Sequence, residues 1–239
     1  MTLNYAISSN IGGRAENEDS LDAKRFGESF VAVVADGLGG QGDGKAASSL
    51  VCSGLMRCGA DGTLPNPDQV KKSFEETNQE LIDHQKNSFH MKSTAVYLCI
   101  QGQKAVWAHV GDSRLYYLRQ GSLVECTMDH SVAQLSVLMG HQKREDIPKD
   151  PARNRLVRVM GVKDEITDVH EPIQLDQGVH GFLLCTDGLW EYLSDEEIEA
   201  AFCSRQTAEA CLSDLLQLRI QRAGESGDNY SAVVIYVKC

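Results

Sequence analysis

The sequence lacks the patterns that mark several common classes of protein. None of its eight cysteines forms the CxxC spacing of a zinc or redox site. Lys and Arg total 23 against 34 Asp and Glu, and no basic run or stripe stands out, which disfavours nucleic-acid binding. No window approaches the roughly 18 apolar residues of a membrane-spanning helix. We therefore expect neither a nucleic-acid partner nor a membrane partner.

The cysteines and the overall composition indicate an ordinary globular protein. Most cysteines sit inside apolar runs, as Cys99 does in YLCIQ and Cys185 does in FLLCTDG, where a reduced thiol behaves as a small core residue. Because no apolar secretory segment opens the chain, we expect a cytoplasmic protein. With 239 residues and 42% hydrophobic content, residues 1–239 are expected to form one domain. The net charge of -11 indicates either simple solubility or a pocket that collects cations.

Apolar segments joined by short turns predict antiparallel strands, and residues at helical spacing predict helices between them. The predicted strands are residues 3–9, 30–35, 93–100, 104–110, 114–119, 122–127, 169–175, 181–186 and 231–238. The predicted helices are residues 43–60, one from Pro67 onward behind the cap Asn66, one behind the capping box Ser194 and Glu197, and residues 207–222. Glycine-containing turns such as IQGQKA disfavour parallel winding. We expect an α+β fold with stacked sheets and helices outside.

Residues 128–168 differ from the rest of the chain. They are polar, contain two glycines and two prolines, and show one short helical pattern, SVAQLSVLM. A plain connection of this length would be unusual in a compact domain. The composition therefore predicts a flap or a small subdomain.

Aspartates recur where apolar runs begin or end, beside a glycine or an asparagine. They are Asp36 in VVADG, Asp112 in AHVGDSR, Asp187 in FLLCTDG and Asp228 in SGDNYSAVV. For any one of them, a turn cap is the simpler interpretation. If the strand ends converge, however, these carboxylates and those of Glu18 and Asp19, in the turn after the first strand, would repel one another strongly. Mg²⁺ or Mn²⁺, which prefer oxygen ligands, would relieve that repulsion.

Such a pocket suits phosphate chemistry. In this hypothesis Asp36 bridges two ions, and Gly37 lets its own carbonyl approach one of them. Two ions about 3.5 to 4 Å apart lower the pKa of a shared water toward neutrality. Arg14, four residues before Glu18, offers a planar fork to phosphate oxygens, although an ordinary surface arginine is the alternative interpretation.

Eight motifs together resemble the bacterial branch of the metal-dependent protein phosphatase family, the type 2C serine/threonine phosphatases. They occur along the whole chain in the family's order and spacing: GGRAENEDS, VVADGLGGQGDG, STAVYLCI, AHVGDSRLYYL, TMDHS, PARNRLVRVMG, FLLCTDGLWE and GDNYSAVVI. The resemblance implies a four-layer αββα sandwich, with two mostly antiparallel sheets flanked by helix pairs. It also implies a dinuclear site at one end and a flap at residues 128–168.

The resemblance implies a role in metal binding for five residues. Asp36 bridges the two ions, and Gly37 gives its carbonyl to one of them. Asp187 and Asp228 complete the coordination of the first ion. Glu18 binds the second ion directly or through water. The expected cofactor is two ions of Mn²⁺ or Mg²⁺, with a third site beside them.

Further roles follow from the same resemblance. Asp19 orders metal-bound water, Asp112 shares the third, weaker ion with Asp187, and Arg14 binds the substrate phosphate. Many eukaryotic members carry a histidine, proposed as the general acid, where this chain has Leu38. A metal-bound water is the candidate replacement.

His109 and His130 are the nearest histidines in motif context. We interpret both as structural, because HVGDSR and DHS resemble scaffold motifs of the family.

Three functions compete. An active phosphatase would act on phosphoserine and phosphothreonine, and by analogy its partners would be a serine/threonine kinase of the same cell and its substrates, with a forkhead-associated protein as a candidate. The second function is a catalytically weak, phosphatase-like regulator that binds a phosphoprotein. A Ca²⁺-binding β protein is disfavoured because the sequence has no DxDxDG loop. We expect a monomer.

Overall fold

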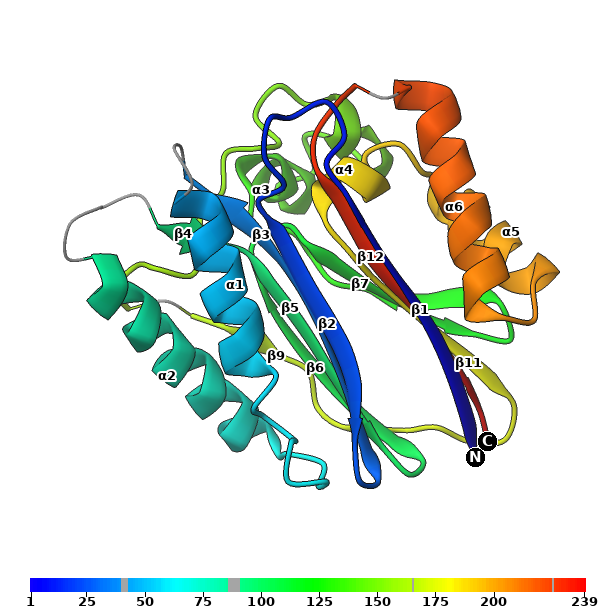
Figure 1. The fold of residues 1–239 in the computed structure, drawn as a ribbon. Coiled ribbons are helices and arrows are strands. Elements are labelled where there is room, and N and C mark those ends of the chain that lie inside the picture. Colours follow the sequence, from blue (N-terminus) through cyan, green and yellow to red (C-terminus); the bar gives the residue numbers. More distant parts are fainter. Residues whose placement is uncertain (40–42, 86–90, 165, 225) are drawn as a thin grey trace.

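Two antiparallel sheets pack face to face in the computed structural model, which describes residues 1–239 except 40–42, 86–90, 165 and 225 (Figure 1). The first sheet has the order β1 (Thr2–Asn10), β12 (Tyr230–Lys238), β11 (Val179–Cys185), β7 (Arg114–Arg119) and β8 (Ser122–Cys126). The second has the order β10 (Ile173–Gln174), β6 (Lys104–Val110), β5 (Ala95–Gln101), β3 (Ser29–Leu38) and β2 (Asp19–Phe26), while β4 (Lys92–Ser93) pairs with β3 and β9 (Asp168–Val169) with β6.

A pair of helices covers the outer face of each sheet, which completes four layers (Figure 1). Helices α1 (Asp43–Leu55) and α2 (Pro67–His84) cover the second sheet, and α5 (Asp195–Ser204) and α6 (Ala208–Ala223) cover the first. The capping boxes that begin α2 and α5 are both present. The predicted αββα sandwich is confirmed.

Buried apolar side chains fill all three interfaces between the layers. One cluster lies between the sheets and includes Phe30, Trp107 and Phe182, and one lies under each helix pair. Four of the cysteines belong to these buried regions, as their apolar surroundings predict: Cys52, Cys99, Cys185 and Cys211. No helix in the described part of the chain is long and apolar enough to cross a membrane.

One strand, β2, is not among the strands that the sequence predicts. Residues of β2 pair with β3 in a register that sets Asp19 opposite Asp36, so Asp19 begins a strand and does not lie in a turn. The strand has the sequence DSLDAKRF, and its polar residues hide the alternating pattern because β2 lies at the edge of the sheet.

Three predicted boundaries need correction. β3 runs to Leu38, so Asp36 lies inside the strand rather than after it. The strand expected at residues 169–175 is two short strands separated by Pro172, which cannot donate a ladder hydrogen bond. Helix α1 ends at Leu55 rather than at residue 60, and Gly59, with a φ of 85°, lies in the turns that follow.

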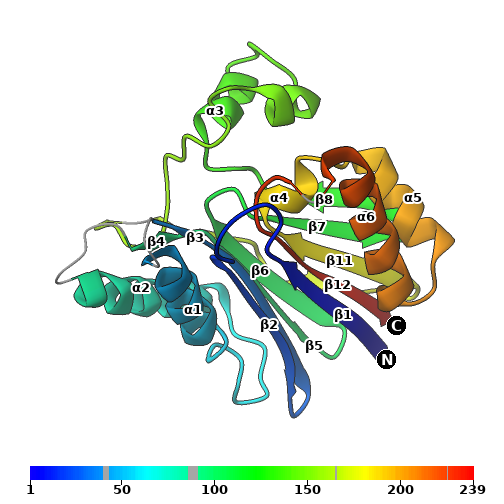
Figure 2. The same cartoon turned by 45° about the horizontal axis from the view of Figure 1, so that its top comes forward.

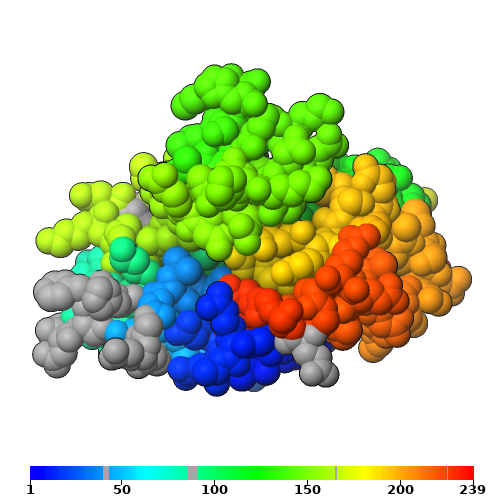
Figure 3. All heavy atoms as spheres, turned by 90° about the horizontal axis from the view of Figure 1, so that it is seen from above, coloured from blue at the N-terminus to red at the C-terminus, as the bar shows by residue number. Residues whose placement is uncertain are grey.

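The part of residues 128–168 around α3 projects from one end of the sandwich, while Met160 and Asp168 pair with strands of the second sheet (Figure 2). They contain α3 (Val132–Leu138), capped by Ser131, and the 3₁₀ helix η2 (Arg144–Lys149). Arg144 pairs with Asp195 at 2.8 Å, which ties this segment to the start of α5. Seen from this end, the green segment borders the light-blue residues of α1 and the yellow residues that follow β11 (Figure 3).

Candidate metal centre

A pocket of 240 Å³ opens at the end of the sandwich beside residues 128–168. Every predicted site residue except Asp19 lines this pocket, although the residues come from distant parts of the chain. The lining residues are Arg14, Glu18, Asp36, Gly37, Leu38, Gly39, Asp112, Asn154, Leu156, Asp187, Asp228 and Asn229. The predicted convergence of carboxylates at one end of two sheets is therefore observed.

The backbone of Asp36 is fixed on both sides. Its N–H donates to Thr94 Oγ1 at 2.9 Å. Its carbonyl accepts from the Thr94 N–H at 2.8 Å and from the Ser93 hydroxyl at 2.9 Å. These bonds fix the backbone of Asp36, which lines the pocket.

Gly37 and Gly44 allow an unusually close approach of backbone and carboxylate. A Cβ at Gly37 would collide with the carbonyl of Gly44 and lie 2.8 Å from the carbonyl of Glu18. A Cβ at Gly44 would collide with the Glu18 carboxylate and lie 2.8 Å from the Gly37 carbonyl. The Gly37 carbonyl and the Glu18 carboxylate therefore meet at the first turn of α1. Both are oxygen ligands of the kind that Mg²⁺ and Mn²⁺ take.

Asp187 and Asp228 are brought together by direct backbone packing. Asp187 opens the short helix α4 (Asp187–Trp190), which the sequence analysis did not predict. A Cβ at Gly188 would collide with the carbonyl of Asn229, so the segments that follow the two aspartates touch each other. This close contact explains why a glycine, with no side chain, follows Asp187.

Asn229 is a site residue that the sequence analysis missed. Its Oδ1 accepts from the N–H of Glu18 at 2.8 Å, and its Nδ2 donates to the carbonyls of Ile11 at 2.8 Å and Glu16 at 3.0 Å. Asn229 therefore ties the loop that carries Glu18 to the loop that carries Asp228. The asparagine directly after Asp228 in GDNYS was the available signal.

The pocket concentrates negative charge. Removal from water raises the pKa of Asp36 and of Asp187 well above the usual range, and neighbouring carboxylates raise both further. The pKa of Asp112 rises to about 7, first through burial and then through Asp129. A divalent cation would favour the ionised forms of all three groups by supplying the opposite charge.

Two buried carboxylate oxygens have no hydrogen-bond partner within the described residues, Oδ1 of Asp19 and Oδ1 of Asp187. The other oxygen of Asp19 accepts from the Thr186 hydroxyl at 2.9 Å, and burial raises the pKa of Asp19 to about 6. Asp19 lies opposite Asp36 across the β2–β3 ladder and does not line the pocket. Orphaned buried oxygens in an all-oxygen cluster fit hard divalent ions or the waters bound to them.

The backbone of Asp112 is bound by Trp190, whose ring packs against Arg114. Its carbonyl accepts from Trp190 Nε1 at 2.9 Å, and the guanidinium of Arg114 lies 3.5 Å from the centre of the Trp190 ring. Arg114 also makes a buried two-point pair with Asp129, with both nitrogen–oxygen distances 2.7 Å. The motif GDSR therefore contains both the pocket carboxylate Asp112 and Arg114, which is fixed by its ion pair with Asp129.

Arg14 lies at the pocket mouth. Its Nη2 donates to Asp228 Oδ2 at 2.6 Å, and its side chain is 59% exposed. Among the lining residues that the structure describes, Arg14 is the one cation. The guanidinium has five N–H donors, so a donor pair is available to an anion that enters the pocket.

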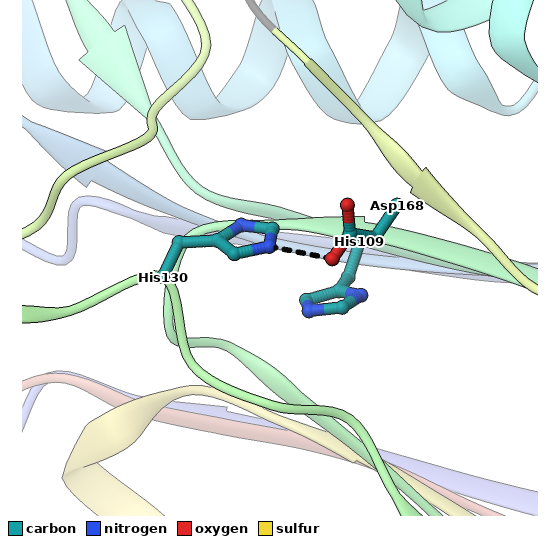
Figure 4. A group of neighbouring side chains, drawn as sticks. All are labelled: His109, His130 and Asp168. Carbon is teal, nitrogen blue, oxygen red and sulfur yellow. Dashed lines mark hydrogen bonds and ion pairs between the residues drawn. The ribbon is translucent and has the colours of Figure 1, made fainter. Parts of the chain in front are cut away.

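A second group, His109, His130 and Asp168, has the composition of a metal site but is bonded as a structural unit (Figure 4). The Gly111 N–H donates to His130 Nδ1 at 3.1 Å, so Nε2 carries the proton and donates to Asp168 Oδ2 at 3.0 Å. The His109 ring stacks on His130 at 4.6 Å, and burial lowers the pKa of His109 to about 4. Neither histidine lines the carboxylate pocket.

The four-layer fold and the all-oxygen pocket are those of a metal-dependent phosphatase. Residues 8–217 match the sequence profile described as protein phosphatase 2C, so the chain belongs to this family, as its motifs predict.

Named relatives agree with the family assignment. The serine/threonine phosphatase stp of Listeria monocytogenes is 29% identical over 237 residues, which cover 95% of this chain and 88% of that protein. The crystal structure of the Mycobacterium tuberculosis serine/threonine phosphatase PstP has a TM-score of 0.88 at 27% identity, with complete coverage of both chains. The PstP catalytic domain in complex with two manganese ions has a TM-score of 0.84, 27% identity and 99% coverage of each chain.

A third relative comes from a secretion system. PppA, described as a key regulatory component of the type VI secretion system in Pseudomonas aeruginosa, is 31% identical, with a TM-score of 0.80, over 98% of this chain and 97% of that one.

Proposed function

We propose that this chain is a metal-dependent protein phosphatase that hydrolyses phosphoserine and phosphothreonine in proteins. The observation that carries the proposal is the convergence of five acidic side chains on one small pocket with a single arginine at its mouth. An uncompensated cluster of this kind is costly, and divalent ions offset that cost. The two manganese ions in the PstP catalytic domain support the same cofactor.

The pocket residues divide the work of holding two ions of Mn²⁺ or Mg²⁺. Asp36 would bridge the two ions. Asp187 and Asp228 would complete the coordination of the first ion, while Glu18 and the Gly37 carbonyl would bind the second. When bound, the ions would lower the pKa of a water toward neutrality and neutralise phosphate charge.

The remaining residues act on substrate, water and a further ion. Arg14 would bind the phosphate of the substrate with the donors that face the pocket. Asp19, with its orphaned oxygen, would orient a water behind Asp36. Asp112 would share a third, weaker ion with Asp187. Leu38 offers no proton, so we infer that water protonates the leaving serine or threonine oxygen.

The organisation of the chain and its partners are part of the proposal. Residues 1–239 would form one catalytic domain, with residues 128–168 as its flap, and Asn154 and Leu156 of the flap line the pocket. We further propose a cytoplasmic monomer that reverses a serine/threonine kinase, with the kinase and its targets as substrates. A forkhead-associated protein is a candidate target, which the likeness to PppA supports.

Turnover of a phosphothreonine peptide tests the proposed activity. Protein stripped with EDTA should be inactive, and Mn²⁺ should restore hydrolysis, while Asp36→Asn should lower kcat by about 10²-fold or more at saturating Mn²⁺. Wild-type protein that binds the phosphopeptide but never releases phosphate would favour the regulatory alternative. Comparison of the phosphoproteome with and without the gene would identify the substrates.

A further inference from the structure

Arg219 is a fully buried arginine on helix α6, with 0% of its surface exposed. Arginine is rarely buried to this extent unless its donors are paired. In the sequence, Arg219 is one residue of an amphipathic helix, and nothing there indicates a role for it. The groups that pair with it reveal one.

The guanidinium of Arg219 donates to four backbone carbonyls. Nε donates to Gly188 at 3.3 Å, Nη1 to Gly224 at 3.0 Å, and Nη2 to Ser226 at 2.9 Å and to Asp228 at 3.3 Å. Figure 1 shows that the C-terminal end of α6 lies at the same end of the sandwich as α4. One side chain therefore joins α4 to the loop before β12.

These two segments carry two of the pocket carboxylates. Gly188 directly follows Asp187, and the fourth carbonyl belongs to Asp228 itself. Because the two aspartates are far apart in the sequence, their relative position depends on contacts between the segments. The Arg219 guanidinium is one such contact, and Arg219 itself does not line the pocket.

The fit around the guanidinium is tight. A Cβ at Gly227 would lie 2.9 Å from Arg219 Nη2, and Gly227 has a φ of 100°, so only glycine suits the loop at this point. The guanidinium carbon lies 3.8 Å from the centre of the Tyr230 ring and 5.4 Å from that of Tyr192. Stacking fixes the plane of the fork, which a lysine ammonium would not reproduce.

We propose that Arg219 is a positioning residue for the metal centre, which acts by holding the backbone of Asp187–Gly188 and of Asp228 at the spacing that one ion requires. The inference rests on the metal assignment proposed above. Loss of a partner that orients metal ligands typically costs about 10-fold to 100-fold in metal affinity. If Arg219 were purely structural, its loss would lower stability but leave the Mn²⁺ affinity of the folded protein unchanged.

Isothermal titration of EDTA-stripped protein with Mn²⁺ tests the proposal. Arg219→Met removes all the donors but keeps an unbranched buried side chain, and its Kd for Mn²⁺ should rise by about 10-fold or more. Leu215→Ala is the matched control, one helical turn earlier in α6 and equally buried. It should lower Tm while its Kd stays within about twofold of wild type. Titrations are made well below the lowest Tm.

The outcomes separate the inference from the metal assignment. If Arg219→Met binds Mn²⁺ like the wild type, or if Leu215→Ala weakens binding equally, Arg219 has no positioning role. If Arg219→Met does not fold, Arg219→Lys decides, since it keeps the charge but reaches fewer carbonyls and should raise Kd several-fold. Its Kd staying at the wild-type value would overturn the inference. Asp228→Asn must lose Mn²⁺ affinity; if it does not, the metal assignment itself is wrong.

Discussion

Replacement of Asp112 by asparagine should make the metal-free protein more stable. Asp112 is 5% exposed and lies in a pocket with other carboxylates. Burial, followed by the charge of Asp129, raises the pKa of Asp112 from 3.8 to about 7. Ionisation of this side chain at neutral pH therefore opposes folding when no cation is bound, and the neutral amide removes that opposition.

The sign and size of the effect follow from the pKa of Asp112. A raised folded-state pKa means that the stability from this group is present below pH 3.8 and is lost as the pH rises through about 7. At 1.36 kcal/mol per pKa unit, the penalty at pH 8 is about 4 kcal/mol. At pH 5 it is about 2 kcal/mol, since only the interval from 3.8 to 5 counts.

Urea unfolding in EDTA at pH 5 and pH 8 measures this difference. The advantage of Asp112→Asn over wild type should grow between the two pH values and shrink when Mn²⁺ is in excess. Asp129→Asn is the contrasting control, because it leaves the buried Arg114 unpaired and should cost about 3 to 5 kcal/mol. An Asp112→Asn protein no more stable than wild type in EDTA at pH 8 would refute the reasoning.

Three further predictions concern the pocket. Asp36→Asn should reduce kcat at saturating Mn²⁺ far more than Asp112→Asn does, because only Asp36 is assigned to both main ions; equal losses would count against the bridging role. Arg14→Ala should raise KM for phosphopeptides while Mn²⁺ affinity is kept, and unchanged KM and kcat would mean that the arginine is misassigned. Gly188→Ala should lower the free energy of unfolding by about 2 kcal/mol or more and weaken Mn²⁺ binding, since its Cβ would collide with the Asn229 carbonyl; wild-type stability and affinity would contradict this steric account.

The sequence predicted the parts of the fold whose patterns are local. Capping boxes at Asn66 and Ser194 located two helices, and apolar strands such as β5 and β11 were recognisable from composition. Strand β2 was missed because an edge strand carries charge on its open side. Helix α4 was missed because four residues give no periodicity to detect.

The acidic residues that line the pocket could be predicted from the sequence, but the residues that hold them in place could not. Aspartates at the ends of apolar runs can be seen in a sequence, whereas the carbonyls that Arg219 holds belong to segments that no local pattern connects. Asn229 follows a predicted ligand, yet its three hydrogen bonds reach the loop after β1, which only the tertiary structure brings near. Convergence depends on packing, and packing is not a local property.

The position of the pocket links metal binding to the packing of the two sheets. Asp36 lies on β3 in the second sheet, whereas Asp187 follows β11 and Asp228 precedes β12 in the first. Without cations, ionisation of these carboxylates would create repulsion between the two sheets at this end, and the apolar core between the sheets would oppose it. A divalent ion held by carboxylates of both sheets would turn this repulsion into attraction. A ligand that binds only the folded state at 100 times its Kd contributes about 2.7 kcal/mol, so the ions would stabilise the closed sandwich as well as supply its chemistry.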